Sequence, residues 1–274
     1  MNLKSALAII LSATILISCH EDPEKMPDTS PSYKEDNITY TADTTSMKGF
    51  VVYDQNKEGK RPGVLVVHEW WGQNDYVRNR ARQLAELGYI AMAVDMFGGG
   101  KEADNPQDAQ TLATPFYQDP QMAKTRLDAA LQQLRSYSQT DSTQIAAIGY
   151  CFGGAVVLNS ALLGSDLKGV VSFHGNLPAT PIKDSLRSGI LVCHGEDDQF
   201  VPQKEINAFN KKMEAAGADY TFKSYSNSTH AFTNPEATEK GKKFNIPIAY
   251  NGSADTASWN DMKAFFNRIF TANK

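Results

Sequence analysis

The segment 149–154, Gly-Tyr-Cys-Phe-Gly-Gly, has the composition of a sharp turn that exposes a reactive side chain. A strand-like apolar run ends at Ile148, and a helix-compatible run, 155–158, follows the turn. Glycines on both sides of Cys151 let backbone segments approach closely, and the N-terminus of a helix stabilises a thiolate. This pattern predicts a nucleophilic cysteine; the alternative is a buried structural cysteine in a glycine-containing turn.

A nucleophilic cysteine needs a base within hydrogen-bonding reach and a third group that orients the base. In a strand, turn and helix context of this kind the chain order is nucleophile, acid, histidine. Asp198 follows a buried strand-like run, and His230 lies in a later polar loop, so the order is met. Asp197 is the nearest competitor for the acid, and Glu196 a weaker one. For His230 the alternative is a solvated loop histidine.

The elements that would position these residues alternate along the chain. Short apolar runs predict buried strands at 49–53, 64–68, 89–94, 144–148, 169–173 and 190–194, with a further strand at 220–225. Apolar residues at helical spacing predict helices at 77–88, 120–134, 202–217 and 255–270. Strands that alternate with helices predict one α/β domain with a mostly parallel central sheet and helices on both faces.

The composition limits the classes of protein that remain possible. The chain has 274 residues, 41% of them hydrophobic, and 27 basic against 31 acidic side chains, for a net charge of −4. These values exclude a disordered chain and a polytopic membrane protein, and they make nucleic acid an unfavourable partner. Three cysteines cannot form a disulfide framework, so each needs its own explanation.

The N-terminus predicts export. Residues 1–18 have Lys4 as their only charge and an apolar stretch from Ala6 to Ile17, which is too short to span a membrane. The sequence around Cys19 resembles a bacterial lipobox, so we expect cleavage before Cys19 and lipidation of its thiol. The alternative is an ordinary cleaved signal. We then expect residues 19–36 to form a tether and residues 37–274 to form the α/β domain. The protein is expected to be a membrane-anchored lipoprotein of the periplasm or cell surface.

Four motifs together resemble those of the dienelactone hydrolase family of α/β-hydrolases, over about residues 38–272. They are Gly-Tyr-Cys-Phe-Gly-Gly at 149–154, His-Glu-Trp-Trp-Gly at 68–72, Asp-Gln-Phe-Val-Pro at 198–202 and His-Ala-Phe at 230–232. The resemblance implies the α/β-hydrolase fold and a triad of Cys151, His230 and Asp198. It implies an oxyanion hole built from the backbone N–H groups of Phe152 and Trp70. It also implies that Glu69 keeps the thiol protonated until substrate enters.

The chain departs from the family where substrate is recognised. The family holds a substrate carboxylate with arginines, one of them four residues after the catalytic histidine, and Asn234 stands at that place here. No arginine lies between Arg82 and Arg126, where the family would place the other, and Lys101 is the one candidate substitute. The substrate is therefore expected to be a different ester, lactone or thioester, including one without a carboxylate.

The remaining reactive side chains have less specific explanations. His68, His174 and His194 follow strands and are expected to be structural or to line the pocket, without the spacing of a metal site. Trp71 is either a core aromatic or a pocket wall, and the segment 98–101 is expected to form a flexible pocket rim. Cys193 is expected to be a buried, inert thiol.

The leading hypothesis is a monomeric hydrolase that cleaves a small carboxylic ester or lactone through a Cys-His-Asp triad, without metal or cofactor. One alternative is an extracytoplasmic deacetylase or thioesterase that acts on a carbohydrate or acyl conjugate. The other is a non-catalytic, ligand-binding lipoprotein.

Overall fold

The computed structural model describes residues 30–271, which form one eight-stranded sheet in the order β1-β2-β4-β3-β5-β6-β7-β8. The strands are β1 (Tyr33–Ala42), β2 (Thr45–Asp54), β3 (Arg61–Val67), β4 (Ile90–Val94), β5 (Thr140–Tyr150), β6 (Gly169–Phe173), β7 (Gly189–Gly195) and β8 (Tyr220–Tyr225). The helices are α1 (Asp75–Glu86), α2 (Pro106–Gln118), α3 (Pro120–Arg135), α4 (Phe152–Leu162), α5 (Gln203–Ala215), α6 (Ala237–Phe244) and α7 (Gly252–Thr271).

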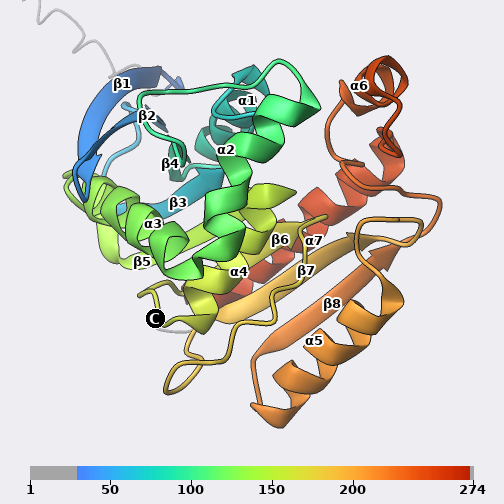
Figure 1. The fold of residues 1–274 in the computed structure, drawn as a ribbon. Helices are drawn as coiled ribbons and strands as arrows, with labels where there is room; N and C mark the ends of the chain where they lie inside the picture. Colours follow the sequence, from blue (N-terminus) through green and yellow to red (C-terminus); the bar gives the residue numbers. More distant parts are fainter. Residues whose placement is uncertain (1–29, 272–274) are drawn as a thin grey trace, which may run out of the picture.

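The sheet is parallel from β4 to β8, and the N-terminal strands β1 and β2 run antiparallel to their neighbours. Helices cover both of its faces (Figure 1). The prediction of a single α/β-hydrolase domain with a mostly parallel sheet is therefore confirmed.

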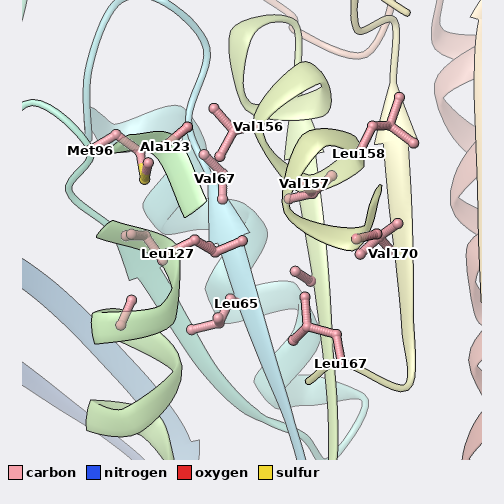
Figure 2. Packing of buried hydrophobic residues seen from close by; sticks show 14 of the residues in the cluster. Leu65, Val67, Met96, Ala123, Leu127, Val156, Val157, Leu158, Leu167 and Val170 are labelled. Carbon is pink, nitrogen blue, oxygen red and sulfur yellow. The ribbon is translucent and has the colours of Figure 1, made fainter. Parts of the chain in front are cut away.

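Strand β3 lies at the centre of the packing. Leu65 and Val67 face one core, and Val64 and Val66 face the other, because successive side chains of a strand point to opposite faces. Figure 2 shows Leu65 and Val67 on the face that helices α3 and α4 cover, near Leu127 and Val157. Helices α1 and α7 cover the opposite face. Because both faces of this strand are buried, its residues from Val64 to Val67 form a continuous apolar run, which made the strand predictable from the sequence.

The tether prediction is wrong at its C-terminal end. Residues 33–36 belong to β1, where Tyr33 pairs with Asp54 of β2, so the sheet begins four residues before the predicted start of the domain at 37. Most side chains of this edge strand are exposed, and the strand therefore lacks the apolar run that marks a buried strand. Helices α2 and α6 were also not predicted.

The expected signal segment 1–18, the expected lipidation site Cys19 and the tether up to residue 29 lie outside the described residues. Within residues 30–271, no helix is both long enough and apolar enough to cross a membrane.

Candidate active site

Cys151 occupies the sharp turn between β5 and α4. Its backbone has φ 53° and ψ −113°, a conformation that a residue with a side chain adopts at a cost. Strained backbone of this kind clusters at functional sites, where the surrounding structure holds it in place. The thiol is partly exposed, at the N-terminus of a helix that is otherwise buried. The turn therefore presents a sulfur atom at a position that favours negative charge.

The glycines around Cys151 are required by close backbone contacts. A Cβ atom at Gly149 would lie 2.0 Å from the carbonyl oxygen of Gly153, and one at Gly153 would lie 2.4 Å from that of Val67. Both distances are far shorter than carbon and oxygen atoms tolerate, and backbone cannot move aside as a flexible side chain can. The first turn of α4 can therefore pack against the ends of β5 and β3 only because both residues are glycine.

We expect Gly153→Ala to lower the free energy of unfolding by about 3 kcal/mol or more, because its methyl group meets two backbone oxygens of the β3 end. Urea unfolding followed by circular dichroism measures the change. Gly252→Ala at the start of α7 is the matched control, since its nearest neighbour would be a tyrosine hydroxyl 3.3 Å away. Equal stability of the two variants would contradict the packing described for this turn.

His230 is bonded to one of the three acidic candidates. Its Nδ1 lies 2.8 Å from Oδ2 of Asp198, and both side chains are buried. Asp197 and Glu196 are exposed, so the geometry selects Asp198 as the orienting acid. Burial alone would lower the pKa of His230, but the neighbouring Cys151 and the hydrogen bond with Asp198 together raise it well above the ordinary value. The imidazole is therefore strongly basic for a buried histidine.

Cys151 and His230 line one cleft of about 600 Å³, together with Glu69 and Trp70. The backbone N–H of Phe152 belongs to the first turn of α4, where no carbonyl of the same helix can accept it. Trp70 follows β3 and also lines the cleft. Within residues 30–271, the N–H groups of Phe152 and Trp70 have no backbone carbonyl in a turn or loop as acceptor. Backbone N–H groups without a protein acceptor are the kind of donor that can stabilise an oxyanion.

Asn234 does not line the cleft, contrary to its expected place in the pocket. It is buried, and its Nδ2 donates to Oε2 of Glu69 at 2.7 Å. Burial raises the pKa of Glu69 above its ordinary value, and this hydrogen bond opposes the rise. Asn234 thus holds the acidic side chain beside the thiol without itself facing substrate.

His174 is also not a pocket residue. Its Nδ1 accepts the backbone N–H of Cys151 at 3.2 Å, and its Nε2 lies 2.7 Å from Oγ1 of Thr233. Burial and the nearby His230 lower the pKa of His174 well below its ordinary value. A neutral imidazole therefore joins the turn of Cys151 to the loop that carries His230. The backbone of His174 has a φ of 41°, in the left-handed region, and the sequence pattern did not indicate this conformation.

Two other pocket expectations have opposite outcomes. Trp71 lines the cleft although it is only 4% exposed, so it is both a core aromatic and a pocket wall. Lys101 is exposed and outside the lining, and the expected rim 98–101 is wrong as well. That segment wraps around the carboxylate of Asp95, which accepts backbone N–H groups from Phe97, Gly98 and Gly100.

The other two histidines are structural. His68 is neutral because burial lowers its pKa to about 4; it accepts the N–H of Met96 at 3.2 Å and so joins the ends of β3 and β4. His194 is buried against Phe222. Neither lines the cleft. Within residues 30–271, no group of three or more histidine, cysteine or acidic side chains is arranged to hold a metal ion.

Cys193 lies in the core on the face of the sheet that α1 and α7 cover, whereas Cys151 packs against the core of the opposite face. Both are free thiols. Burial raises the pKa of Cys193 to about 12, so this thiol is unreactive at neutral pH.

Sequence reasoning missed part of the cleft wall. Helix α2 contributes Gln110, Ala113, Thr114 and Tyr117, and the segment after α6 contributes Ile246 and Ile248. None of these side chains belongs to a catalytic motif. Tertiary contacts bring the later segment to the site, among them the parallel bridge between His230 and Ile248 and the bond from the N–H of Asn251 to the carbonyl of Phe232.

Comparisons with known proteins bear on the family and the fold of the chain. A sequence model of the dienelactone hydrolase family matches residues 47–270. Protein usf of Aquifex pyrophilus is 31% identical over 217 residues, which are 77% of this chain and 89% of that protein. A crystal structure of a dienelactone hydrolase-like promiscuous phosphotriesterase from metagenomic libraries is 34% identical with a TM-score of 0.82, and the match covers 87% of this chain and 99% of that one.

A thermophilic esterase of Thermogutta terrifontis shares the fold, with 17% identity and a TM-score of 0.62 over 90% of this chain and 96% of that one. The fold, the turn at Cys151 and the cleft define an α/β-hydrolase. The chain belongs to the dienelactone hydrolase family, and it is a carboxylic ester hydrolase.

Proposed function

We propose that the protein hydrolyses a carboxylic ester or lactone through a covalent acyl-thiol intermediate, with Cys151 as the nucleophile, His230 as general base and Asp198 as the acid that orients it. The observation that carries this proposal is the 2.8 Å contact between His230 and Asp198 at the cleft that the Cys151 thiol lines. A nucleophile, a base and an orienting acid are the parts that such catalysis requires.

The reaction proceeds in two halves. His230 takes the proton of Cys151, and the sulfur attacks the ester carbonyl to form a tetrahedral oxyanion. The N–H groups of Phe152 and Trp70 stabilise that oxyanion, each by about 3 kcal/mol. His230 then protonates the departing alcohol, leaving an acyl-thiol. Finally, His230 deprotonates a water that attacks this acyl group, and the acid product leaves as the thiol re-forms.

The test is hydrolysis of p-nitrophenyl acetate by the chain from residue 20 onward, before and after treatment with one equivalent of iodoacetamide. Alkylation of Cys151, located by peptide mass spectrometry, is expected to abolish turnover while the buried Cys193 stays unmodified. Turnover that survives complete alkylation of Cys151 would rule out the cysteine mechanism. Binding of esters without any turnover would instead favour a ligand-binding role.

Glu69 restrains the thiol until substrate enters. Its carboxylate lies on the same cleft as Cys151, and negative charge there opposes formation of the thiolate. Because burial raises the pKa of Glu69, the carboxyl is neutral at low pH and gains its charge as pH rises through that raised value. The restraint is therefore present at high pH and disappears at low pH.

We expect Glu69→Gln to increase the rate of alkylation of Cys151 by about 5-fold at pH 8, with a ratio that falls towards one as pH decreases. The measurement is the rate of iodoacetamide labelling as a function of pH. Glu196→Gln, which removes an exposed carboxylate outside the cleft, is the control and leaves the rate unchanged. A slower or pH-independent ratio in Glu69→Gln would contradict the restraint.

The location of the protein is part of the proposal. Residues 1–18 direct export, and lipid on Cys19 anchors a monomeric enzyme to a membrane facing the periplasm or the exterior. Metabolic labelling with a palmitate analogue tests this directly. Label is expected in the full chain and absent from Cys19→Ser; equal labelling of both would refute the anchor.

A further inference from the structure

The cleft beside Cys151 carries almost no charge. Its apolar lining includes Trp70, Trp71, Ala113, Phe200, Ile246 and Ile248, and its polar lining is mostly uncharged. Glu69 is the one acidic residue among the lining residues of the described chain, and no lysine or arginine is among them. The charge that the cleft can present to a substrate is therefore negative or zero, apart from the proton on His230.

Two cations that contact residues in and behind the cleft walls are engaged elsewhere. Lys240 bonds to Oε2 of Glu236 at 2.8 Å and lies 5.2 Å from the centre of the Trp71 ring, outside the lining. Arg80 is buried behind the loop of His230, where it bonds to Asp255 at 2.5 Å and to the carbonyl of Thr233 at 2.7 Å. Neither cation lines the cleft, and each is bonded to a carboxylate of the protein itself.

Two exposed aromatic side chains also line the cleft. Tyr117 is 46% exposed and Phe200 is 43% exposed, although large aromatic side chains gain free energy from burial. Their rings lie against buried parts of the site. The ring centres of Phe200 and His230 are 5.0 Å apart, and those of Tyr117 and Phe152, the residue after Cys151, are 5.8 Å apart. An exposed apolar surface at a cleft is a place where a ligand binds.

We propose that the substrate is an uncharged ester or lactone whose apolar group is covered by Tyr117 and Phe200. This inference rests on the proposed function and specifies its substrate class. A carboxylate in the cleft would lose water without gaining a lysine or arginine partner, and it would approach Glu69, a group of the same sign. An apolar group would instead cover the exposed faces of both aromatic rings. The cleft thus selects against anionic esters.

A matched pair of substrates tests the selection. The p-nitrophenyl ester of suberic acid monomethyl ester is uncharged, and p-nitrophenyl hydrogen suberate has the same chain with a free carboxylate. We expect kcat/KM to be about 30-fold or more higher for the uncharged ester. Equal values, or a preference for the anion, would overturn the substrate class and leave the proposed function intact. Turnover of neither ester above the rate of Cys151→Ala would overturn both.

A charge variant tests whether the lining sets this preference. Gln110→Arg places a cation at the cleft, and we expect the ratio of the two kcat/KM values to move about 10-fold towards the anion. Gln107→Arg is the matched control, because it lies on the same helix, one turn earlier, and outside the lining. No change in Gln110→Arg, or an equal change in both variants, would overturn the role of the lining.

A second variant tests the aromatic cover. Tyr117→Ala is expected to lower the ratio of kcat/KM for p-nitrophenyl octanoate to that for the acetate by about 10-fold, since only the longer acyl group reaches the apolar face. Leu87→Ala removes a side chain that is similarly exposed, at 41%, but lies away from the cleft, and it leaves the ratio unchanged. An unchanged ratio in Tyr117→Ala would overturn the assignment.

Discussion

Cys151→Ala is expected to lower kcat/KM for p-nitrophenyl acetate by about 10⁴-fold or more while the chain stays folded. The variant cannot form the acyl-thiol, so His230 has no nucleophile to activate. The oxyanion donors of Phe152 and Trp70 remain, and they account for a small residual rate. Because Cys151 is partly exposed and lines the cleft, a smaller side chain at this position enlarges the cleft rather than opening a closed cavity in the core.

Cys193→Ala is the control for that loss. This thiol lies in the opposite core and has a pKa of about 12, so it takes no part in the reaction. Its replacement is expected to cost stability and to leave kcat/KM within about twofold when measured well below the unfolding temperature. Full activity in Cys151→Ala, or an equal loss in Cys193→Ala, would contradict the assignment of the nucleophile.

Asp198→Asn is expected to lower kcat/KM by about 10³-fold, because an amide at this position can donate to Nδ1 of His230 and so hold the wrong tautomer of the imidazole. The substitution also removes a contact that raises the pKa of His230. The imidazole of the variant should therefore titrate at a lower pH, which NMR of labelled histidine measures.

The neighbouring carboxylate provides the matched control for Asp198. Asp197 is exposed, one residue earlier in the same loop, and Asp197→Asn makes the same change in charge and volume. We expect that variant to keep wild-type activity and the wild-type titration of His230. A loss in Asp197→Asn as large as that in Asp198→Asn would mean that loop charge, rather than the hydrogen bond, supports catalysis.

The parts of the site that could be predicted from sequence are those in which local geometry restricts the residue type. Gly149 and Gly153 stand where backbone contacts leave no room for a side chain, so the turn at Cys151 has a recognisable pattern. The central strands were predictable for a related reason: β3 is buried on both faces from Val64 to Val67, and a strand buried in this way is continuously apolar.

The remaining parts depend on tertiary contacts that leave no local pattern. Asn234 holds Glu69, a residue 165 positions earlier, and nothing around Asn234 indicates that partner. His174 supports the backbone of Cys151 from behind, although its place after a strand equally suggested a pocket residue. Tyr117 and Ala113 are ordinary residues of a helix, and they become cleft residues only because α2 lies over the site. Edge strand β1 was missed because its side chains are mostly exposed.

The most direct measurement of the central claim is to identify the residue that carries the acyl group during turnover. The chain is mixed with excess p-nitrophenyl butanoate, quenched in acid within the first turnover and digested, and its peptides are examined by mass spectrometry. A butanoyl thioester is expected on Cys151, and it is expected to be absent from Cys151→Ala and from Cys151 alkylated beforehand. Butanoyl on another residue that is released at the rate of turnover, or steady turnover without any acylated peptide, would contradict the central claim.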